Sequence, residues 1–124
     1  AVAYAKERVQ FGKPVASFQL VQDALASCLS DITSTFALIA RVTELEERGE
    51  ALDEHSSMAK LVAANKGRDV VARCREILGG NGIVIDYNVI RHFADAESQY
   101  SFEGTREINS LILGRMITGI QAFV

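Results

Sequence analysis

The residues best suited to chemistry lie just before the last apolar run of the chain, between Tyr100 and Thr105. Glu103 stands there between the aromatic Phe102 and Gly104. A carboxylate beside an aromatic ring can be partly removed from water, which raises its pKa toward the range of a general base. Gly104 lets the backbone approach a flat ligand, and Thr105 can cap the next helix or donate to that ligand. A Glu before a Gly-Thr turn is more often an ordinary helix-start acid, so this segment alone does not establish catalysis.

A second set of candidate binding residues surrounds a predicted helix break near the start of the chain. It contains Arg8, Phe11 and Pro14, with Phe18 and Gln19 shortly after. An Arg can bind a phosphate through two hydrogen bonds, an aromatic ring can pack on a flat ring, and Gln can read polar edges. On spacing alone, a corner between two helices with both Phe side chains in the core is the simpler interpretation.

The third candidate is a glycine-rich stretch, Gly79-Gly80-Asn81-Gly82. It is not a phosphate-binding P-loop because no Lys-Ser/Thr pair follows it, and no strand precedes it as a dinucleotide-binding fingerprint requires. Its bare backbone would let a ligand or a neighbouring subunit lie against it. A helix stop followed by a glycine turn is the simpler explanation of this stretch taken alone.

The histidines and cysteines do not predict a metal site. His55 and His92 have no partners at metal-ligand spacing and are expected at surface or capping positions. Cys28 and Cys74 fall within helical patterns and are expected as reduced thiols in the core. The sequence also contains no recognisable Ser-His-Asp or Cys-His arrangement for nucleophilic catalysis.

The composition is that of a single globular domain. The chain has 124 residues, of which 48% are apolar and 23% charged. A net charge of −3 without runs of like charge argues against a nucleic-acid partner. No uninterrupted apolar run reaches the roughly 18 residues of a membrane span, and no signal peptide is visible, so we expect neither.

The spacing of apolar residues predicts an all-α fold, an up-and-down bundle of long antiparallel helices. Ser17 and Asp53 are predicted N-caps, and Gly49 is a predicted C-terminal helix stop. Only the run Ile83-Val84-Ile85 could form a strand. The predicted helices cover residues 1–9, 18–48, 53–78, 87–97 and 105–123.

Two faces of these helices follow from the same periodicity. In the second helix the apolar positions 21, 25, 28, 32, 36 and 39 are spaced by three and four residues and are expected to face the core. In the third helix most cations are expected to face outward, namely Lys60, Lys66, Arg68, Arg73 and Arg75. Because the first residue is not Met and residues 1–8 look like the middle of a helix, we also expect the chain to be a segment of a longer protein.

Taken together, these stretches resemble the C-terminal helical domain of the acyl-CoA dehydrogenases, end to end. No single motif is specific, but four occur in the right order and at the right separations. Within the family, the segments Val89–His92 and Leu113–Phe123 are most similar to glutaryl-CoA dehydrogenases. The four motifs are Arg8-x-x-Phe11-Gly12-x-Pro14, Phe18-Gln19, Ile77-Leu78-Gly79-Gly80-Asn81-Gly82 and Glu103-Gly104-Thr105.

The resemblance implies a role for each candidate residue. Glu103 matches the family's catalytic base, which removes the α-proton of an acyl thioester while a hydride leaves the β-carbon for the flavin. Thr105 matches a residue that contacts the flavin of its own subunit. The residues implied to reach the FAD of the neighbouring subunit are Arg8, Phe11, Gln19 and, through its backbone, Gly80.

The resemblance also implies the partners of the whole protein. These are FAD, an acyl-CoA substrate such as glutaryl-CoA or another short-chain acyl-CoA, and an electron-transferring flavoprotein or similar acceptor. It implies a homo-oligomer, a dimer of dimers, with an N-terminal helical domain and a middle β domain ahead of this one. The expected location is cytoplasmic, or the mitochondrial matrix if the source is eukaryotic. The alternatives are an acyl-CoA oxidase-type relative and a non-catalytic helical oligomerisation module.

This chain departs from the family pattern at a few positions. Phe102 stands where many members carry Tyr, and Arg106 and the segment Ala94-Asp95-Ala96 differ from the glutaryl pattern. The family's selector for a substrate carboxylate lies in the N-terminal part, outside this sequence. The resemblance therefore implies the dehydrogenase class more directly than it implies glutaryl specificity.

Overall fold

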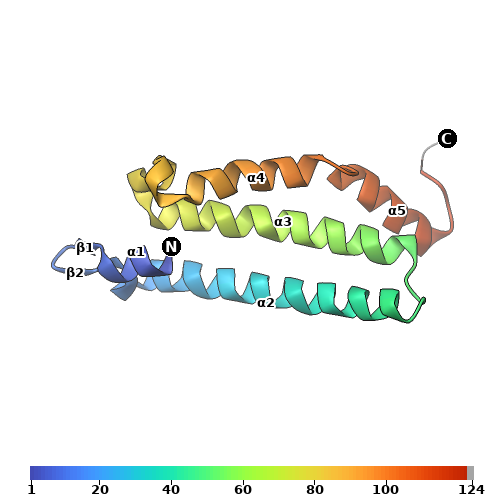
Figure 1. Ribbon diagram of the computed structural model, residues 1–124, viewed down its shortest axis with the longest axis horizontal. Helices are drawn as coiled ribbons and strands as arrows, with labels where there is room; N and C mark the ends of the chain where they lie inside the picture. Colours follow the sequence, from blue (N-terminus) through green and yellow to red (C-terminus); the bar gives the residue numbers. More distant parts are fainter. Residues whose placement is uncertain (123–124) are drawn as a thin grey trace.

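The computed structural model describes residues 1–122, and helices dominate this part of the chain (Figure 1). The predicted all-α class is confirmed, with one hairpin of two-residue strands as the only addition within residues 1–122. In chain order the elements are α1 (Val2–Glu7), β1 (Val9–Gln10), β2 (Lys13–Pro14), η1 (Val15–Ser17), α2 (Gln19–Glu47), α3 (Asp53–Ile77), η2 (Gly79–Ile83), η3 (Ile85–Tyr87), α4 (Val89–Ser101) and α5 (Arg106–Thr118), where η denotes a short 3₁₀ helix.

Helix α3 lies in the middle of the molecule and contacts α2, α4 and α5 (Figure 1). Helix α2 runs antiparallel to α3 along one side, and α4 followed by α5 runs back along the other side. This order confirms the predicted up-and-down arrangement. Because α2 packs mainly on α3, its remaining faces are open within the described chain.

Helix ends follow local backbone chemistry at the predicted glycine. Gly49 adopts a left-handed conformation, with φ of 68°. Its N–H donates to the Glu46 carbonyl at 3.0 Å, and the N–H of Glu50 donates to the Leu45 carbonyl at 2.9 Å. These two bonds form a Schellman motif that ends α2 as predicted. Helix α5 ends earlier than predicted, because Gly119 is left-handed after Thr118, while the predicted end at Phe123 lies outside the described residues.

Both predicted N-caps of the long helices are wrong. Ser17 belongs to η1, where its hydroxyl donates to the Pro14 carbonyl at 2.7 Å, so it does not cap α2. Asp53 is the first residue of α3 and not its cap. The N–H of Leu52 instead donates to Nδ1 of His55 at 2.9 Å, which confirms His55 as a capping residue.

Residues 83–85 do not form the strand that their β-branched side chains allowed. The N–H of Val84 donates to the Asn81 carbonyl at 3.2 Å, and the N–H of Tyr87 donates to the Val84 carbonyl at 3.2 Å. These local bonds, each to the third residue before, satisfy the backbone within η2 and η3. The segment therefore turns the chain from α3 back into α4.

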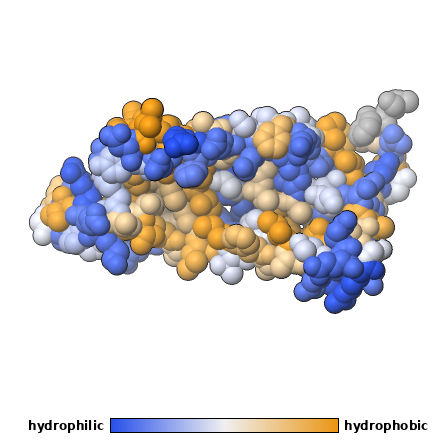
Figure 2. Space-filling model, viewed as in Figure 1, coloured by the Kyte–Doolittle hydropathy of each residue, from blue (hydrophilic) through white to orange (hydrophobic). Residues whose placement is uncertain are grey.

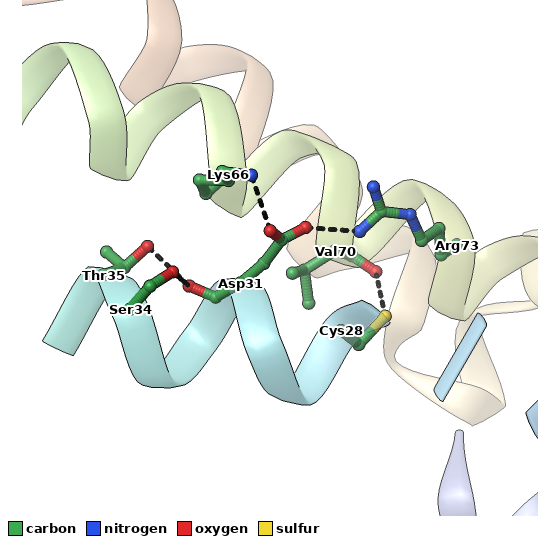
Figure 3. Close-up of polar contacts among 7 residues, drawn as sticks. All are labelled: Cys28, Asp31, Ser34, Thr35, Lys66, Val70 and Arg73. Atoms are coloured by element: carbon green, nitrogen blue, oxygen red, sulfur yellow. Dashed lines mark hydrogen bonds and ion pairs between the residues drawn. The ribbon is translucent and has the colours of Figure 1, made fainter. Parts of the chain in front are cut away.

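A partly buried ion-pair cluster joins α2 to α3 (Figure 3). Lys66 Nζ donates to Asp31 Oδ1 and Arg73 Nη1 donates to Asp31 Oδ2, each at 2.6 Å. The hydrogen bond from Lys66, followed by that from Arg73, holds the pKa of the Asp31 carboxyl below its usual range. Arg68 pairs with Glu97 of α4 at 2.8 Å. The expectation that these three cations face outward is therefore wrong, because each meets a carboxylate on a neighbouring helix.

The apolar stripe of α2 is only partly covered. Cys28 and Asp31 are buried against α3, whereas Ile32, Phe36 and Ile39, which were expected to face the core, are exposed. Figure 2 shows apolar side chains gathered along the α2 side of the molecule. A single packed helix covers only a narrow strip of its neighbour, so the rest of the stripe stays uncovered within residues 1–122.

The same helix has the length and composition of a membrane span. Helix α2 reaches a mean hydropathy of 1.3 over 18 residues, and 6% of that window is buried among the described residues. Polar residues such as Asp23 and Asp31 interrupt the apolar positions of this helix, so a search for uninterrupted apolar runs does not detect it. The apolar stripe accounts for this hydropathy, and the ion pairs at Asp31 attach the same helix to α3. The absence of a membrane span stays a prediction.

Candidate functional site

A cavity of about 740 Å³ opens at the end of the molecule where the N-terminal elements meet the start of α2 and the end of α3. It brings together four of the six candidate residues, although they are spread over some 70 positions of the chain. The four are Arg8, Phe11, Gln19 and Gly80.

The hairpin that presents Phe11 has an unusual turn. Residues Val9 and Pro14 pair across it, and Phe11 and Gly12 form the two-residue loop with φ of 53° and 77°. Positive φ at both positions is the type I′ geometry, which Asn, Asp or Gly adopt more readily than Phe. A non-glycine residue in this region costs about 1–2 kcal/mol. The chain thus holds an aromatic ring at a strained and exposed position.

The exposure of Phe11 excludes the simpler interpretation of this segment. Its side chain is 90% exposed, so it is not part of a core between helices. The ring meets Phe18 edge to face, with ring centroids 6.0 Å apart, and Lys13 Nζ lies 4.5 Å from the centroid of the Phe18 ring. The two aromatic rings and the ammonium therefore form one exposed ledge beside the cavity.

Arg8 supplies the positive charge of the cavity wall. It is the only Lys or Arg among the described residues that line the cavity. Its backbone is tied down on both sides, since its N–H donates to the Tyr4 carbonyl and its carbonyl accepts from the Val15 N–H, each at 2.8 Å. The guanidinium forms no ion pair with any residue between 1 and 122. An exposed, unpaired guanidinium beside an aromatic ledge suits a phosphate-bearing ligand.

The glycine stretch closes the other side of the cavity. A Cβ on Gly80 would meet no atom within 4 Å, so its backbone is open toward the cavity. A Cβ on Gly82 would overlap the Arg75 carbonyl oxygen, which explains the glycine there by close packing. Asn81 has a structural role that its motif does not predict, because its Nδ2 donates to the Tyr4 hydroxyl at 3.0 Å and ties this stretch to α1.

Glu103 and Thr105 lie away from this cavity, at the junction of α4 and α5 (Figure 1). Thr105 caps α5 as predicted, because its hydroxyl oxygen accepts from the Ile108 N–H at 3.4 Å. Glu103 is exposed, and its carboxylate has no hydrogen bond or ion pair to residues 1–122. The expected removal of Glu103 from water by Phe102 is therefore wrong for this chain alone, because the Phe102 ring is itself 49% exposed.

The length of helix α3 gives the separation between the cavity and the loop of Glu103. Lys60 of α3 lies beside the loop of Glu103, with Nζ 4.9 Å from the centroid of the Phe102 ring. Glu76 of the same helix lines the cavity. At 1.5 Å per residue, the 16 residues between them span about 24 Å. One chain therefore carries two half-sites, one with a cation and an aromatic ring and one with a free carboxylate.

The structure adds supporting residues that the motifs do not contain. Lys60 Nζ donates to the Gln99 carbonyl at the end of α4, and the Arg68 guanidinium lies 4.0 Å from the centroid of the Tyr100 ring. Asn109 of α5 is buried and donates to the loop after Glu103. The sequence signal for Asn109 is a polar residue within the apolar stripe of the last helix. This signal does not identify the carbonyl groups to which Asn109 donates.

Comparisons with known proteins show the family of this chain. A family model described as "Acyl-CoA dehydrogenase, C-terminal domain" matches residues 1–118. Acryloyl-CoA reductase (NADH) of Anaerotignum propionicum is 34% identical over 117 residues, which are 94% of this chain and 30% of that protein.

Solved structures show the same fold. A crystal structure of glutaryl-CoA dehydrogenase from Mycobacterium smegmatis superposes with a TM-score of 0.96 at 35% identity. A structure of a glutaryl-CoA dehydrogenase from that organism in complex with FADH2 superposes with a TM-score of 0.96 at 31% identity. Each match covers 99% of this chain and 32% of the other. The chain thus spans about a third of the length of the proteins it matches.

Proposed function

The chain belongs to the acyl-CoA dehydrogenase family, in which it corresponds to the C-terminal domain, and from this premise we propose that the whole protein dehydrogenates an acyl-CoA thioester with FAD. The remainder of that protein would contain the N-terminal helical and middle β domains. The observation that carries the proposal is the cavity, which gathers the four residues that the family resemblance implies as FAD contacts.

The residues around the cavity fit part of a flavin dinucleotide. Arg8 offers an unpaired guanidinium for a phosphate, and Phe11 offers an exposed ring for a flat group. Gln19 adds a polar side chain, and Gly80 adds an open backbone. The strained conformation of Phe11 supports a binding role, because a packing-only hairpin gains nothing from an aromatic ring held out in water.

In the proposed reaction the Glu103 carboxylate takes the α-proton of the thioester. The β-carbon loses a hydrogen with its electron pair, and an α,β-unsaturated thioester results. FAD, when bound, supplies the acceptor for that hydride. Thr105 contacts the flavin of the same subunit. The exposed position of Glu103 is consistent with this role, because the other domains and the substrate would cover it in the whole protein.

The separation of the half-sites supports a shared site between subunits. Arg8, Phe11, Gln19 and Gly80 would contact the FAD of a neighbouring subunit, and Glu103 would serve its own. The uncovered apolar stripe of α2 supports association of copies, and a groove of about 190 Å³ between α2 and α3 lies along it. We propose a homo-oligomer, a dimer of dimers, with an electron-transferring flavoprotein or a similar acceptor as its redox partner.

The test uses the full-length protein. We expect it to purify yellow with bound FAD, and we expect its flavin to bleach without oxygen when glutaryl-CoA or another short-chain acyl-CoA is added. Unsaturated acyl-CoAs belong in the same panel, to be tested for reoxidation of reduced flavin, because one relative is a reductase. A colourless protein would instead favour the helical oligomerisation module, and bound flavin that no acyl-CoA bleaches would contradict the proposed activity.

An acyl-CoA oxidase-type relative would use the same residues, since a base at Glu103 suits both enzymes. The reduced flavin separates them. Rapid reoxidation by O₂ in the presence of product favours the oxidase, whereas slow reoxidation by O₂ and rapid electron transfer to an electron-transferring flavoprotein favour the dehydrogenase.

A further inference from the structure

The side chain of Glu103 depends on its backbone for its orientation. Its carboxylate has no hydrogen bond or ion pair within residues 1–122, so no side chain among these residues fixes its direction. Glu103 and Gly104 both have positive φ, at 53° and 89°. Gly104 adopts this conformation without cost, but for Glu103 it is unfavourable and persists only where surrounding contacts hold it.

The residue before Glu103 is held from α3 and α4. The N–H of Phe102 donates to the Ser98 carbonyl at 3.0 Å, at the end of α4. Lys60 donates to the Gln99 carbonyl and places its ammonium over the Phe102 ring. The backbone is therefore anchored immediately before Glu103.

The residues after Glu103 are held by one side chain. Asn109 Nδ2 donates to the Gly104 carbonyl at 2.9 Å and to the Thr105 carbonyl at 3.0 Å. Asn109 is 6% exposed on α5, a helix that packs on α3. A Cβ on Gly104 would lie 3.3 Å from the same nitrogen, so the amide also fills the space beside the glycine. One buried amide thus orients two successive peptide groups next to Glu103.

We infer that Asn109 is a positioning residue for the Glu103 carboxylate, holding the loop in the conformation from which the base acts. This inference rests on the proposed function and extends it to a residue outside its motifs. Asn109 touches neither substrate nor flavin in this inference and acts only through the backbone of residues 104 and 105. Since a displacement of about 1 Å of a reacting group can lower a rate by about a hundredfold, loss of these two bonds should slow proton abstraction by about tenfold to a hundredfold.

The test compares three variants of the full-length protein. Asn109→Leu removes both donors at similar volume, and Asn109→Gln keeps the donors on a longer side chain. Asn65→Leu is the matched control, because Asn65 Nδ2 also donates to a backbone carbonyl, at 2.7 Å, but to Leu61 of its own helix. The measurements are flavin content, acyl-CoA binding by spectral shift, flavin reduction in single turnover, and hydrogen exchange of the amides of residues 108 and 109, which donate to the hydroxyl and the carbonyl of Thr105.

We expect Asn109→Leu to reduce its flavin about tenfold to a hundredfold more slowly at saturating acyl-CoA, with unchanged binding of FAD and acyl-CoA. Asn109→Gln should recover part of the rate, and Asn65→Leu should match wild type. Exchange of the amides of residues 108 and 109 should accelerate in Asn109→Leu, because their acceptors on Thr105 are then held less firmly. A wild-type rate with unchanged exchange in Asn109→Leu would overturn the inference. An equal loss in Asn65→Leu would also overturn it, because the effect would then be general destabilisation.

The inference and the proposed function can fail separately. If no acyl-CoA bleaches the wild-type flavin, the proposed function fails and Asn109 has no base to position. If wild type is bleached while Asn109→Leu is reduced at the same rate, the proposed function stands and the inference fails. Should Asn109→Leu not fold, Asn109→Gln decides: slower flavin reduction together with faster exchange at residues 108 and 109 supports the two-bond anchor, and wild-type values of both overturn the inference.

Discussion

Arg8→Glu and Glu103→Gln, placed on different subunits of one dimer, test whether the two half-sites of a chain serve different flavins. The structure separates the half-sites by about 24 Å along α3, while each keeps its key side chain unpaired within residues 1–122. Arg8→Glu places a carboxylate against a bound phosphate and should abolish FAD binding at the site it serves. Glu103→Gln is nearly isosteric but cannot accept a proton, so it should abolish chemistry in its own subunit.

The expected activity follows from counting sites. If Arg8 contacts the partner's FAD, a mixed dimer has one site with both substitutions and one site with neither. Such a dimer should keep roughly half of the wild-type activity and half of its flavin. If Arg8 and Glu103 served the same site, each site would carry one defect and the activity would remain near that of the parent variants.

The assay uses the two full-length variants co-expressed with different affinity tags and purified through both. Acyl-CoA-dependent flavin bleaching and steady-state turnover are then compared with the two homo-oligomeric variants and with doubly tagged wild type. Folded mixed dimers without restored turnover would refute the assignment of Arg8 to the neighbouring subunit's flavin.

Three further predictions concern single sites of the full-length protein. Glu103→Gln should slow flavin reduction in single turnover by about 10²–10⁴-fold while FAD and acyl-CoA still bind, and near-normal reduction would mean that the base lies elsewhere. Because the folded-state pKa of Asp31 is lowered by its two cationic partners, the carboxylate stabilises the fold above its unfolded pKa, near 3.8, and this stability is lost as the pH falls through the folded-state pKa. Asp31→Asn should therefore lower the melting temperature at pH 7 and make it fall less than that of wild type between pH 7 and pH 3; equal falls would contradict this. Gly82→Ala should destabilise by about 1–3 kcal/mol because the new Cβ overlaps the Arg75 carbonyl oxygen. Gly114→Ala, with open space around the new Cβ inside α5, should stabilise by up to about 1 kcal/mol, and equal melting temperatures for the two alanine variants would refute the packing argument.

The sequence by itself determined the secondary structure and the family. The spacing of apolar residues predicted the long helices, because a helical face repeats within a few residues and needs no knowledge of the partner. The helix-ending role of Gly49 and the capping role of Thr105 could be predicted for the same reason, since the free N–H and C=O groups at a helix end bond to atoms close along the chain. The order of four short motifs was sufficient to predict the family that residues 1–118 match.

Only the tertiary structure decided which side chains meet across helices. Asp31 is a polar residue next to the apolar positions of α2, and its pairing with Lys66 and Arg73 depends on the register between α2 and α3. Asn109 likewise needed the path of the loop before its acceptors were known. The gathering of Arg8 with Gly80, and the distance of both from Glu103, follow from where α3 begins and ends relative to its neighbours. Such contacts join residues far apart in the chain, so no local pattern specifies them, and periodicity alone could not show that α2 keeps an apolar face uncovered.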